Sequence, residues 1–153
     1  LNPDEPLAYY NLGATLNNSG HFVEAAQRYL EAKDRCPVGS LPWAKATACA
    51  FNKLAREECA EVAKPEWWND EELKALSARV VKAAPDDGIA HQMRAGVLNG
   101  RCSGVWEEGP RSAAELREAA THWDRAAALH PAPVVKAQIA GEAARCRSQA
   151  EAM

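Results

Sequence analysis

The chain has 153 residues, enough for one domain that buries roughly two-thirds of the surface exposed by its unfolded form. Charged residues make up 25% and hydrophobic residues 47%, as in ordinary soluble proteins, and no apolar run approaches the roughly 20 residues of a transmembrane helix. The formal net charge is -3, with both signs scattered along the chain, so no basic stripe could neutralise a nucleic-acid backbone. These features exclude a membrane span and disfavour nucleic acid as a partner.

Two helices are predicted at the start of the chain. The first covers about residues 6–18 and ends at Ser19-Gly20, which is typical of a turn. The second covers 22–35 and ends before Pro37, because proline cannot continue a helix. The short connection between them predicts a helical hairpin.

The third helix is expected to begin at Leu41 or Pro42. No helix breaker follows until Pro65, so the helix is expected to extend as far as Ala63. Apolar side chains recur at helical spacing through this extension, at Phe51, Leu54, Ala55, Cys59 and Val62.

A fourth helix follows the turn "KPEWWND". Asn69 or Asp70 is expected to cap it, and the buried stripe contains Leu73, Leu76 and Val80.

Three further helices complete the prediction. The fifth covers about 87–98, the sixth runs from the capping box of Ser112 and Glu115 to about 129, and the last covers about 132–149. Almost nothing favours strands, so the chain is predicted to be all-α. An irregular stretch, "NGRCSGVWEEGPR" at 99–111, separates the fifth and sixth helices.

The prolines that follow the predicted helices reveal a period. Pro3 and Pro37 are 34 residues apart, and the intervals from Pro37 to Pro85 and from Pro85 to Pro131 are 48 and 46 residues. The longer intervals correspond to one 34-residue unit with 14 or 12 inserted residues. A fixed period of this size is typical of helical repeat proteins.

Residues 4–37 resemble one tetratricopeptide repeat. The matching positions are the aromatic Tyr9, the pair Leu12-Gly13, the apolar Leu16, the small Ala25 and Ala32, the aromatic Tyr29 and the final Pro37. Small residues at such positions let two helices cross closely while larger ones fill the flanking space.

The later units match less fully. The same count places Trp43 and His91 at the aromatic position of repeats 38–85 and 86–131, and "ELREAATHWDRAAALHP" matches a second helix. The resemblance implies a single domain over 1–153, an α-solenoid of antiparallel helix pairs with about seven helices, wound as a right-handed superhelix. Residues 132–151 are expected to form a capping helix with charges along much of its length. Because Leu1-Asn2-Pro3 resembles the end of a preceding helix, we expect the domain to be part of a longer chain.

The irregular stretch holds the strongest candidates for chemistry, but no recognisable site. Cys102 follows Arg101, yet no nucleophile signature surrounds it, and the adjacent Glu107 and Glu108 side chains diverge. We expect an insertion in a turn, with Cys102 unreactive and Trp106 buried as an anchor. The two tryptophan-bearing turns are expected to pack on each other.

Metal and cofactor sites are not indicated. The histidines at 21, 91, 122 and 130 lack metal-ligand spacing, and His91 is expected to pack in the core. No phosphate-binding or dinucleotide-binding motif is present. The five cysteines are odd in number and widely spaced, which predicts buried, reduced thiols in the cytoplasm or another reducing intracellular compartment: Cys36, Cys49, Cys59, Cys102 and Cys146.

The resemblance implies a concave groove, lined by the first helix of each repeat, that binds a peptide or partner protein. The candidate contact residues at groove positions are Tyr10, Asn17, Asn18, Lys45, Phe51, Asn52, Gln92 and Asn99. Trp67 and Trp68 are added because exposed tryptophans favour binding hot spots. The clamp that chaperone-binding members use for a terminal carboxylate is missing, since Tyr10, Ala14, Lys45, Ile89 and Met93 occupy its positions.

The leading hypothesis is a non-catalytic protein-interaction scaffold. One alternative is a substrate-recognition or regulatory segment of a larger enzyme, of the glycosyltransferase or hydroxylase type. The other is a structural subunit that uses the convex face or the Trp67-Trp68 turn in an assembly.

Overall fold

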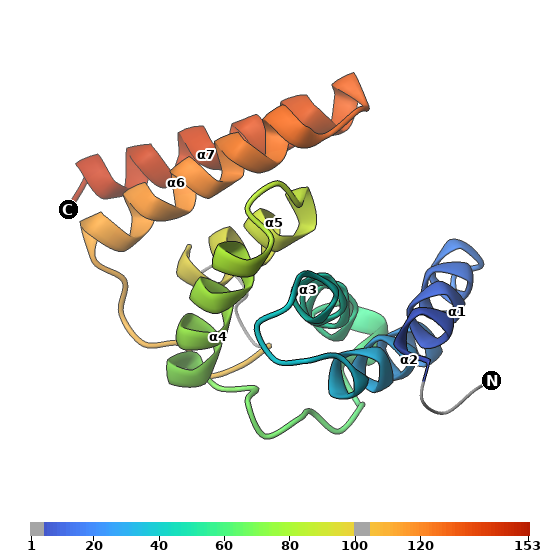
Figure 1. The fold of residues 1–153 in the computed structure, drawn as a ribbon. Coiled ribbons are helices and arrows are strands. Elements are labelled where there is room, and N and C mark those ends of the chain that lie inside the picture. Colours follow the sequence, from blue (N-terminus) through green and yellow to red (C-terminus); the bar gives the residue numbers. More distant parts are fainter. Residues whose placement is uncertain (1–4, 100–104) are drawn as a thin grey trace.

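The computed structural model describes residues 5–99 and 105–153. These residues form seven α-helices and a single turn of 3₁₀ helix, and no strand occurs among them (Figure 1). The predicted all-α class with about seven helices is confirmed.

The first hairpin consists of α1 (Pro6–Asn18) and α2 (Phe22–Arg35), with the bounds predicted from the sequence. The two helices cross closely at Gly13, where an added Cβ would lie only 2.9 Å from the ring of Tyr29. Ala25 and Ala32 on α2 are fully or almost fully buried. The close crossing therefore depends on small residues, as the sequence indicated.

The third helix is shorter than predicted. α3 covers Leu41–Leu54, and after it Arg56 leaves the helical conformation, with φ -77° and ψ 152°, before the 3₁₀ turn η1 (Glu57–Cys59). The expected continuation of one helix to Ala63 is wrong.

Tertiary packing explains the early end of α3. The turn buries Cys59 completely against Ala26 and Leu54, and the Lys64 ammonium donates to the carbonyl oxygens of Cys59 and Val62 at 2.6 and 2.8 Å. A helix continued to Ala63 would carry the chain about 13 Å past Leu54 and away from this packing. Local helix propensity is too weak to outweigh such burial.

The central hairpin consists of α4 (Asp70–Ala83) and α5 (Gly88–Leu98). The side chain of Asn69 caps α4 by accepting from the Glu72 amide, and the side chain of Asp87 caps α5 by accepting from the Ala90 amide. Of the two residues predicted to cap α4, Asn69 is therefore the cap, and Asp70 begins the helix.

The last hairpin consists of α6 (Ala113–Leu129) and α7 (Pro133–Glu151). The predicted capping box of Ser112 and Glu115 is present at the start of α6. One face of α7 packs on α6, and its buried residues are Ile139, Ala143, Cys146 and Ala150. Most of the remaining surface of α7 is exposed.

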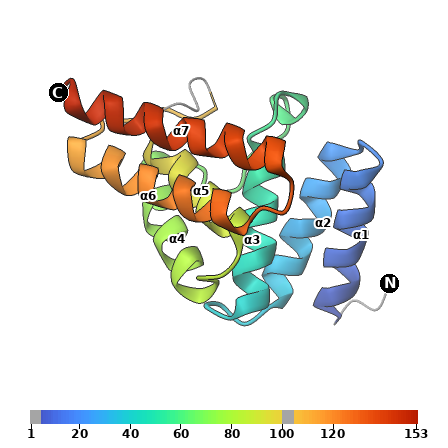
Figure 2. The same ribbon diagram turned by 90° about the horizontal axis from the view of Figure 1, so that it is seen from above.

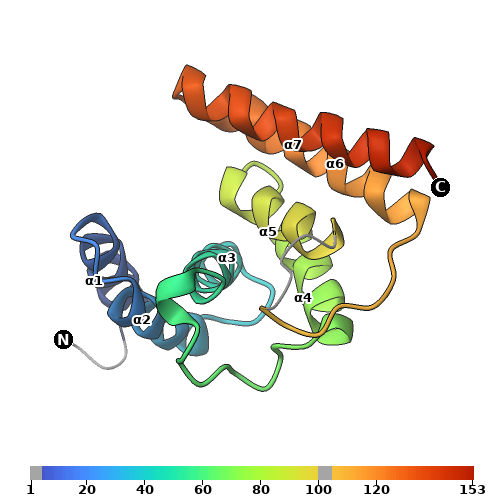
Figure 3. The ribbon, with the colours of Figure 1, turned by 180° about the vertical axis from the view of Figure 1, so that it is seen from behind.

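Helices that follow each other in the chain pack side by side, and α3 also packs on α5 (Figures 2 and 3). This order of packing is compatible with a helical repeat arrangement. The largest core cluster lies between α3, α4 and α5 and includes Trp43, Phe51, Leu73, Met93 and Trp106. The α6–α7 hairpin packs on the rest of the molecule through α5.

Two expectations fall on residues outside the described ranges, the helix end at 1–3 and the unreactive thiol of Cys102. Within 5–99 and 105–153, no helix combines the length and the apolar character that crossing a bilayer requires.

Candidate binding pocket between α1 and α3

A pocket of about 350 Å³ opens between the first helices of the first two predicted repeats. The end of α2 closes its base, so three helices contribute to the wall. The lining residues are Pro6, Leu7, Tyr10, Ala32, Cys36, Leu41, Pro42, Lys45 and Ala46.

Two leucines at the pocket are unusually exposed. Leu7 on α1 is 61% exposed and Leu41 on α3 is 53% exposed. Large apolar side chains that line one pocket and remain in contact with water mark a surface that gains free energy when it is covered.

The wall formed by Tyr10 is rigid and uncharged. Its ring packs edge-on against Tyr29, with centroids 5.5 Å apart, and its hydroxyl lies 3.7 Å from the Cys49 thiol. Burial raises the pKa of the Tyr10 hydroxyl and of the Cys49 thiol, so both groups are neutral at pH 7.

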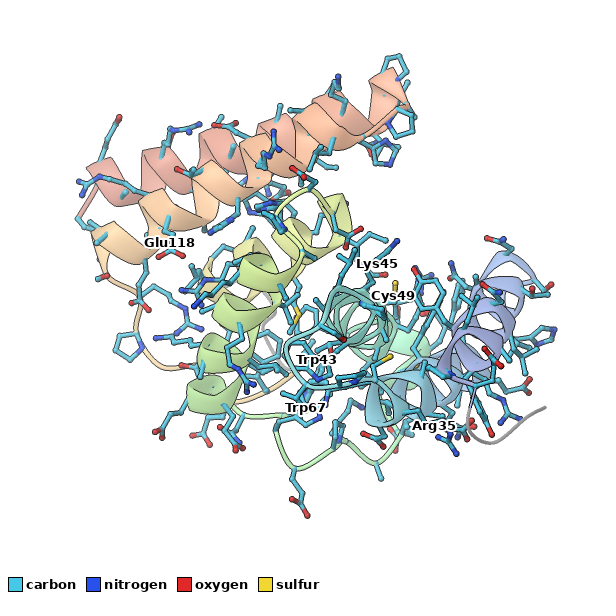
Figure 4. The ribbon with its side chains drawn as sticks, viewed as in Figure 1. Arg35, Trp43, Lys45, Cys49, Trp67 and Glu118 are labelled. Atoms are coloured by element: carbon cyan, nitrogen blue, oxygen red, sulfur yellow. The ribbon has the colours of Figure 1, made fainter. Side chains whose placement is uncertain are left out.

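Lys45 is the charged residue of the pocket wall. In Figure 4 it lies with Cys49 on one side of α3, while Trp43 and Trp67 lie on the other side. Within the described residues, Lys45 has no ion pair with an acidic side chain. The pocket can therefore bury apolar groups and offer a positive charge at one side.

The sequence-predicted contact residues are not brought together into one surface. Tyr10 and Lys45 line this pocket, whereas Asn17 and Asn18 lie at the far end of α1. The side chains of Asn52 and Gln92, on α3 and α5, are half-buried outside the pocket.

Phe51 and Asn99 do not face a groove, which corrects their expected exposure. Both are buried, at 5% and 6% exposed. Phe51 packs against Trp68 and Trp106, with ring centroids 5.3 and 5.9 Å apart. Gly96 on α5 faces this cluster, and an added Cβ there would lie 4.0 Å from the Phe51 ring, an ordinary van der Waals contact.

The two adjacent tryptophans differ in their surroundings. Trp68 packs on Phe51 and donates from its indole nitrogen to the carbonyl oxygen of Val105 at 3.1 Å. Trp67 lies beside the Lys33 ammonium, 5.6 Å from the ring centroid. Both side chains are half-buried, so Trp67 remains the better candidate for contact with a partner.

The tryptophan-bearing turns pack on each other, as expected. Trp68 and Trp106 meet edge-to-face, with centroids 5.7 Å apart, and Trp106 is 7% exposed. The stretch around Trp106 is an anchored connection in this part of the chain.

An ion pair that the sequence did not indicate fixes this connection. The Asp70 carboxylate accepts from both terminal nitrogens of Arg111, at 2.6 and 3.1 Å, from the Trp106 indole at 3.1 Å and from the Gly109 amide at 3.2 Å. These donors, Arg111 foremost, lower the pKa of Asp70 to about 2, although desolvation opposes them. Asp70 and Arg111 are 41 residues apart, and no short-range pattern connects them.

The pocket also contains residues that sequence reasoning did not select, namely Pro6, Cys36, Pro42 and Ala46. Cys36 and Pro42 flank the turn between α2 and α3, and Pro6 begins α1. A helix-terminal position beside a predicted groove is the signal that could have identified them.

The described cysteines are buried free thiols, as predicted: Cys36, Cys49, Cys59 and Cys146. Burial raises the pKa of Cys36, Cys49 and Cys59, which keeps these three thiols protonated and unreactive at neutral pH. Across the described part of the chain, no three His, Cys, Asp or Glu side chains converge on a possible metal position.

Comparison with known proteins adds no further identification. A scan against protein-family models finds no match, and a search of curated proteins finds none either.

Proposed function

We propose that this chain is a protein-interaction module of the tetratricopeptide type, and that the pocket between α1 and α3 binds apolar side chains of a peptide segment of its partner. The observation that carries the proposal is the pair of exposed leucines, Leu7 and Leu41, at one apolar pocket. The proposed role is binding rather than catalysis.

The dimensions and chemistry of the pocket support a peptide ligand. A volume of about 350 Å³ accommodates one or two large apolar side chains, and the neutral Tyr10 ring provides a flat wall. The Lys45 ammonium can donate a hydrogen bond to a backbone carbonyl oxygen or a carboxylate beside those side chains. A single lysine does not form a clamp for a terminal carboxylate, so the proposal does not extend to chaperone tails.

A displayed peptide library provides the test. Peptides selected on the wild-type domain are measured against Leu7→Ser and Leu41→Ser, which remove apolar contacts at exposed sites without opening the core. We expect each substitution to weaken binding about tenfold, since loss of a central apolar contact costs about 1–2 kcal/mol.

Val134→Ser is the matched control, because Val134 is 72% exposed on α7, outside the pocket. Its affinity for the selected peptides should equal that of the wild type. Selected peptides that bind all three variants equally well would contradict the assignment of the pocket.

A further inference from the structure

Two histidines join α5 to α6 in a way that the proposed peptide pocket does not use. The Nδ1 atoms of His91 and His122 are 2.9 Å apart, and the planes of the two rings are inclined by 27° with centroids 5.1 Å apart. His91 is buried, and the His122 side chain is 17% exposed. The pair therefore lies at a largely dry helix–helix contact.

The outer nitrogens of both rings face groups that accept hydrogen bonds. His91 Nε2 lies 2.7 Å from the carbonyl oxygen of Pro85, which can only accept, so this nitrogen carries a proton. His122 Nε2 lies 3.3 Å from the Glu118 carboxylate, and Figure 4 shows Glu118 on the side of α6 turned toward the central hairpin. Glu118 also accepts from Arg94 Nε at 2.9 Å.

Glu118 is ionised in this arrangement. Partial burial raises its pKa, but the hydrogen bonds and charges of Arg94 and His122 outweigh that effect and hold the pKa below the usual range. A carboxylate is an acceptor only, so the contact with His122 Nε2 is a hydrogen bond when this nitrogen is also protonated.

The proton count follows from these partners. Both outer nitrogens carry a proton, and an N···N distance of 2.9 Å is a hydrogen bond when one proton lies between the two inner nitrogens. Three protons on two imidazoles give the pair one positive charge. A neutral pair leaves a nitrogen lone pair facing the Glu118 carboxylate or two lone pairs facing each other, and a doubly charged pair brings two N–H groups against each other.

We propose that His91 and His122 share one proton as a singly charged pair, and that this pair is a pH-sensitive latch between α5 and the α6–α7 hairpin. Loss of the shared charge weakens the link to Glu118, and a second proton drives the rings apart. Since the hairpin packs on the rest of the molecule through α5, opening the latch loosens that hairpin.

The charged groups around the pair act on the protonation of the pair in opposite directions. On balance the pKa of His122 is lowered, because burial, the largest cause, and the charges on His91 and Arg94 outweigh the opposing effect of Glu118. Neither α3 nor α7 contributes a hydrogen bond or ion pair to either ring among the described residues, although both helices pack against this hairpin contact. Helix α4 is connected to the histidine pair only through Arg94. The Arg94 guanidinium donates to the Lys74 carbonyl oxygen and the Ser77 hydroxyl on α4 as well as to Glu118.

The dependence of stability on pH follows with a defined sign. In the unfolded chain both histidines titrate near pH 6.5. Below that pH the folded pair binds fewer protons than the unfolded chain, so stability falls on acidification; above it the folded pair retains its proton longer, so stability falls as the pH rises. The latch contributes most near pH 6.5 and less on both sides.

Nuclear magnetic resonance of the imidazole nitrogens tests the proposal directly. We expect His91 and His122 to titrate together in two steps, one above and one below pH 6.5 and at least about one unit apart, as strongly coupled sites do. Independent single-step titration of His91 and His122, each near pH 6.5, would overturn the proposal.

Unfolding measurements on variants provide a second readout. The contribution of the latch is the difference in the free energy of unfolding between wild type and His122→Phe. This difference is measured from about pH 5 to pH 8. We expect that difference to be largest near pH 6.5, whereas His21→Gln should keep the wild-type profile. If His122→Phe unfolds during purification, His122→Gln takes its place, since the glutamine side chain is polar but does not take up a proton between pH 5 and pH 8. A difference that does not vary with pH would also overturn the proposal.

Discussion

The α1–α2 hairpin and the region of α3, α4 and α5 are stabilised by different means. In the hairpin, the helices meet through small residues such as Gly13 and Ala25 against the Tyr29 ring, all within 17 residues of sequence. In the central region, two long connections bring Trp68 and Trp106 onto Phe51, and the Asp70–Arg111 pair holds them there. Insertions in a helical repeat can thus become part of the core instead of loosening it.

The largest expected effect comes from removing the central tryptophan. Trp106→Ala deletes two edge-to-face ring contacts and the indole hydrogen bond to Asp70. We expect the free energy of unfolding to fall by about 3–5 kcal/mol, the usual cost of truncating a buried aromatic side chain. Urea denaturation measures the change.

Trp106→Phe is the companion variant, because it keeps an aromatic ring and loses the indole N–H. Trp106→Phe should lower the free energy of unfolding clearly less than Trp106→Ala does. A loss below about 1 kcal/mol for Trp106→Ala would show that the connection does not contribute to the core as we describe.

The next largest effect concerns the Asp70 carboxylate. Asp70→Asn replaces the charged acceptor of Arg111, and we expect a loss of about 2 kcal/mol at neutral pH. The folded-state pKa of about 2 lies below the ordinary value of 3.8, so the carboxylate stabilises the fold above pH 3.8, and this contribution is lost as the pH falls through 2.

The free energies of unfolding of wild type and Asp70→Asn are therefore compared at about pH 6 and at about pH 2. The difference between the two proteins should be smaller at pH 2. Asp86→Asn is the control, since Asp86 is 86% exposed in a surface pair with Arg125 and should change stability by less than about 1 kcal/mol. An Asp70→Asn difference that is the same at both pH values would argue against a charge-assisted clamp.

The smallest effects distinguish two glycines, Gly13 and Gly141, which lie ten residues after Pro3 and Pro131 and so occupy equivalent positions in the predicted period. Gly13→Val forces branched carbon atoms into the Tyr29 ring and should cost about 1–3 kcal/mol. Gly141 has no atom within 4 Å of an added Cβ, so Gly141→Ala should stabilise α7 by about 0.5–1 kcal/mol.

Thermal unfolding of the two variants shows whether each substitution raises or lowers the melting temperature. Opposite shifts in the melting temperature confirm that only the first hairpin depends on a glycine crossing. Shifts of the same sign would contradict the comparison.

Two residues of the candidate pocket could be anticipated from the repeat pattern. Tyr10 and Lys45 follow from their positions in that pattern, and both line the pocket. Phe51 and Asn99 occupy comparable positions but are buried, because α5 packs directly on α3. A position within a repeat specifies the side of a helix, whereas the distance to the next helix depends on side chains from both.

The sequence by itself determined the all-α class, five of the seven helices to within a few residues, the start of α4 and the Ser112 cap of α6, and it narrowed the α4 cap to Asn69 or Asp70. These features depend on hydrogen bonds and apolar spacing within a few residues, which local sequence specifies. Only the tertiary structure decided where α3 ends, how Asp70 meets Arg111 and how His91 meets His122. The two side-chain contacts join residues 31 and 41 positions apart, and α3 ends early because burial of Cys59 against other helices outweighs local helix propensity. The energies of these features depend on partners that no short stretch of sequence contains.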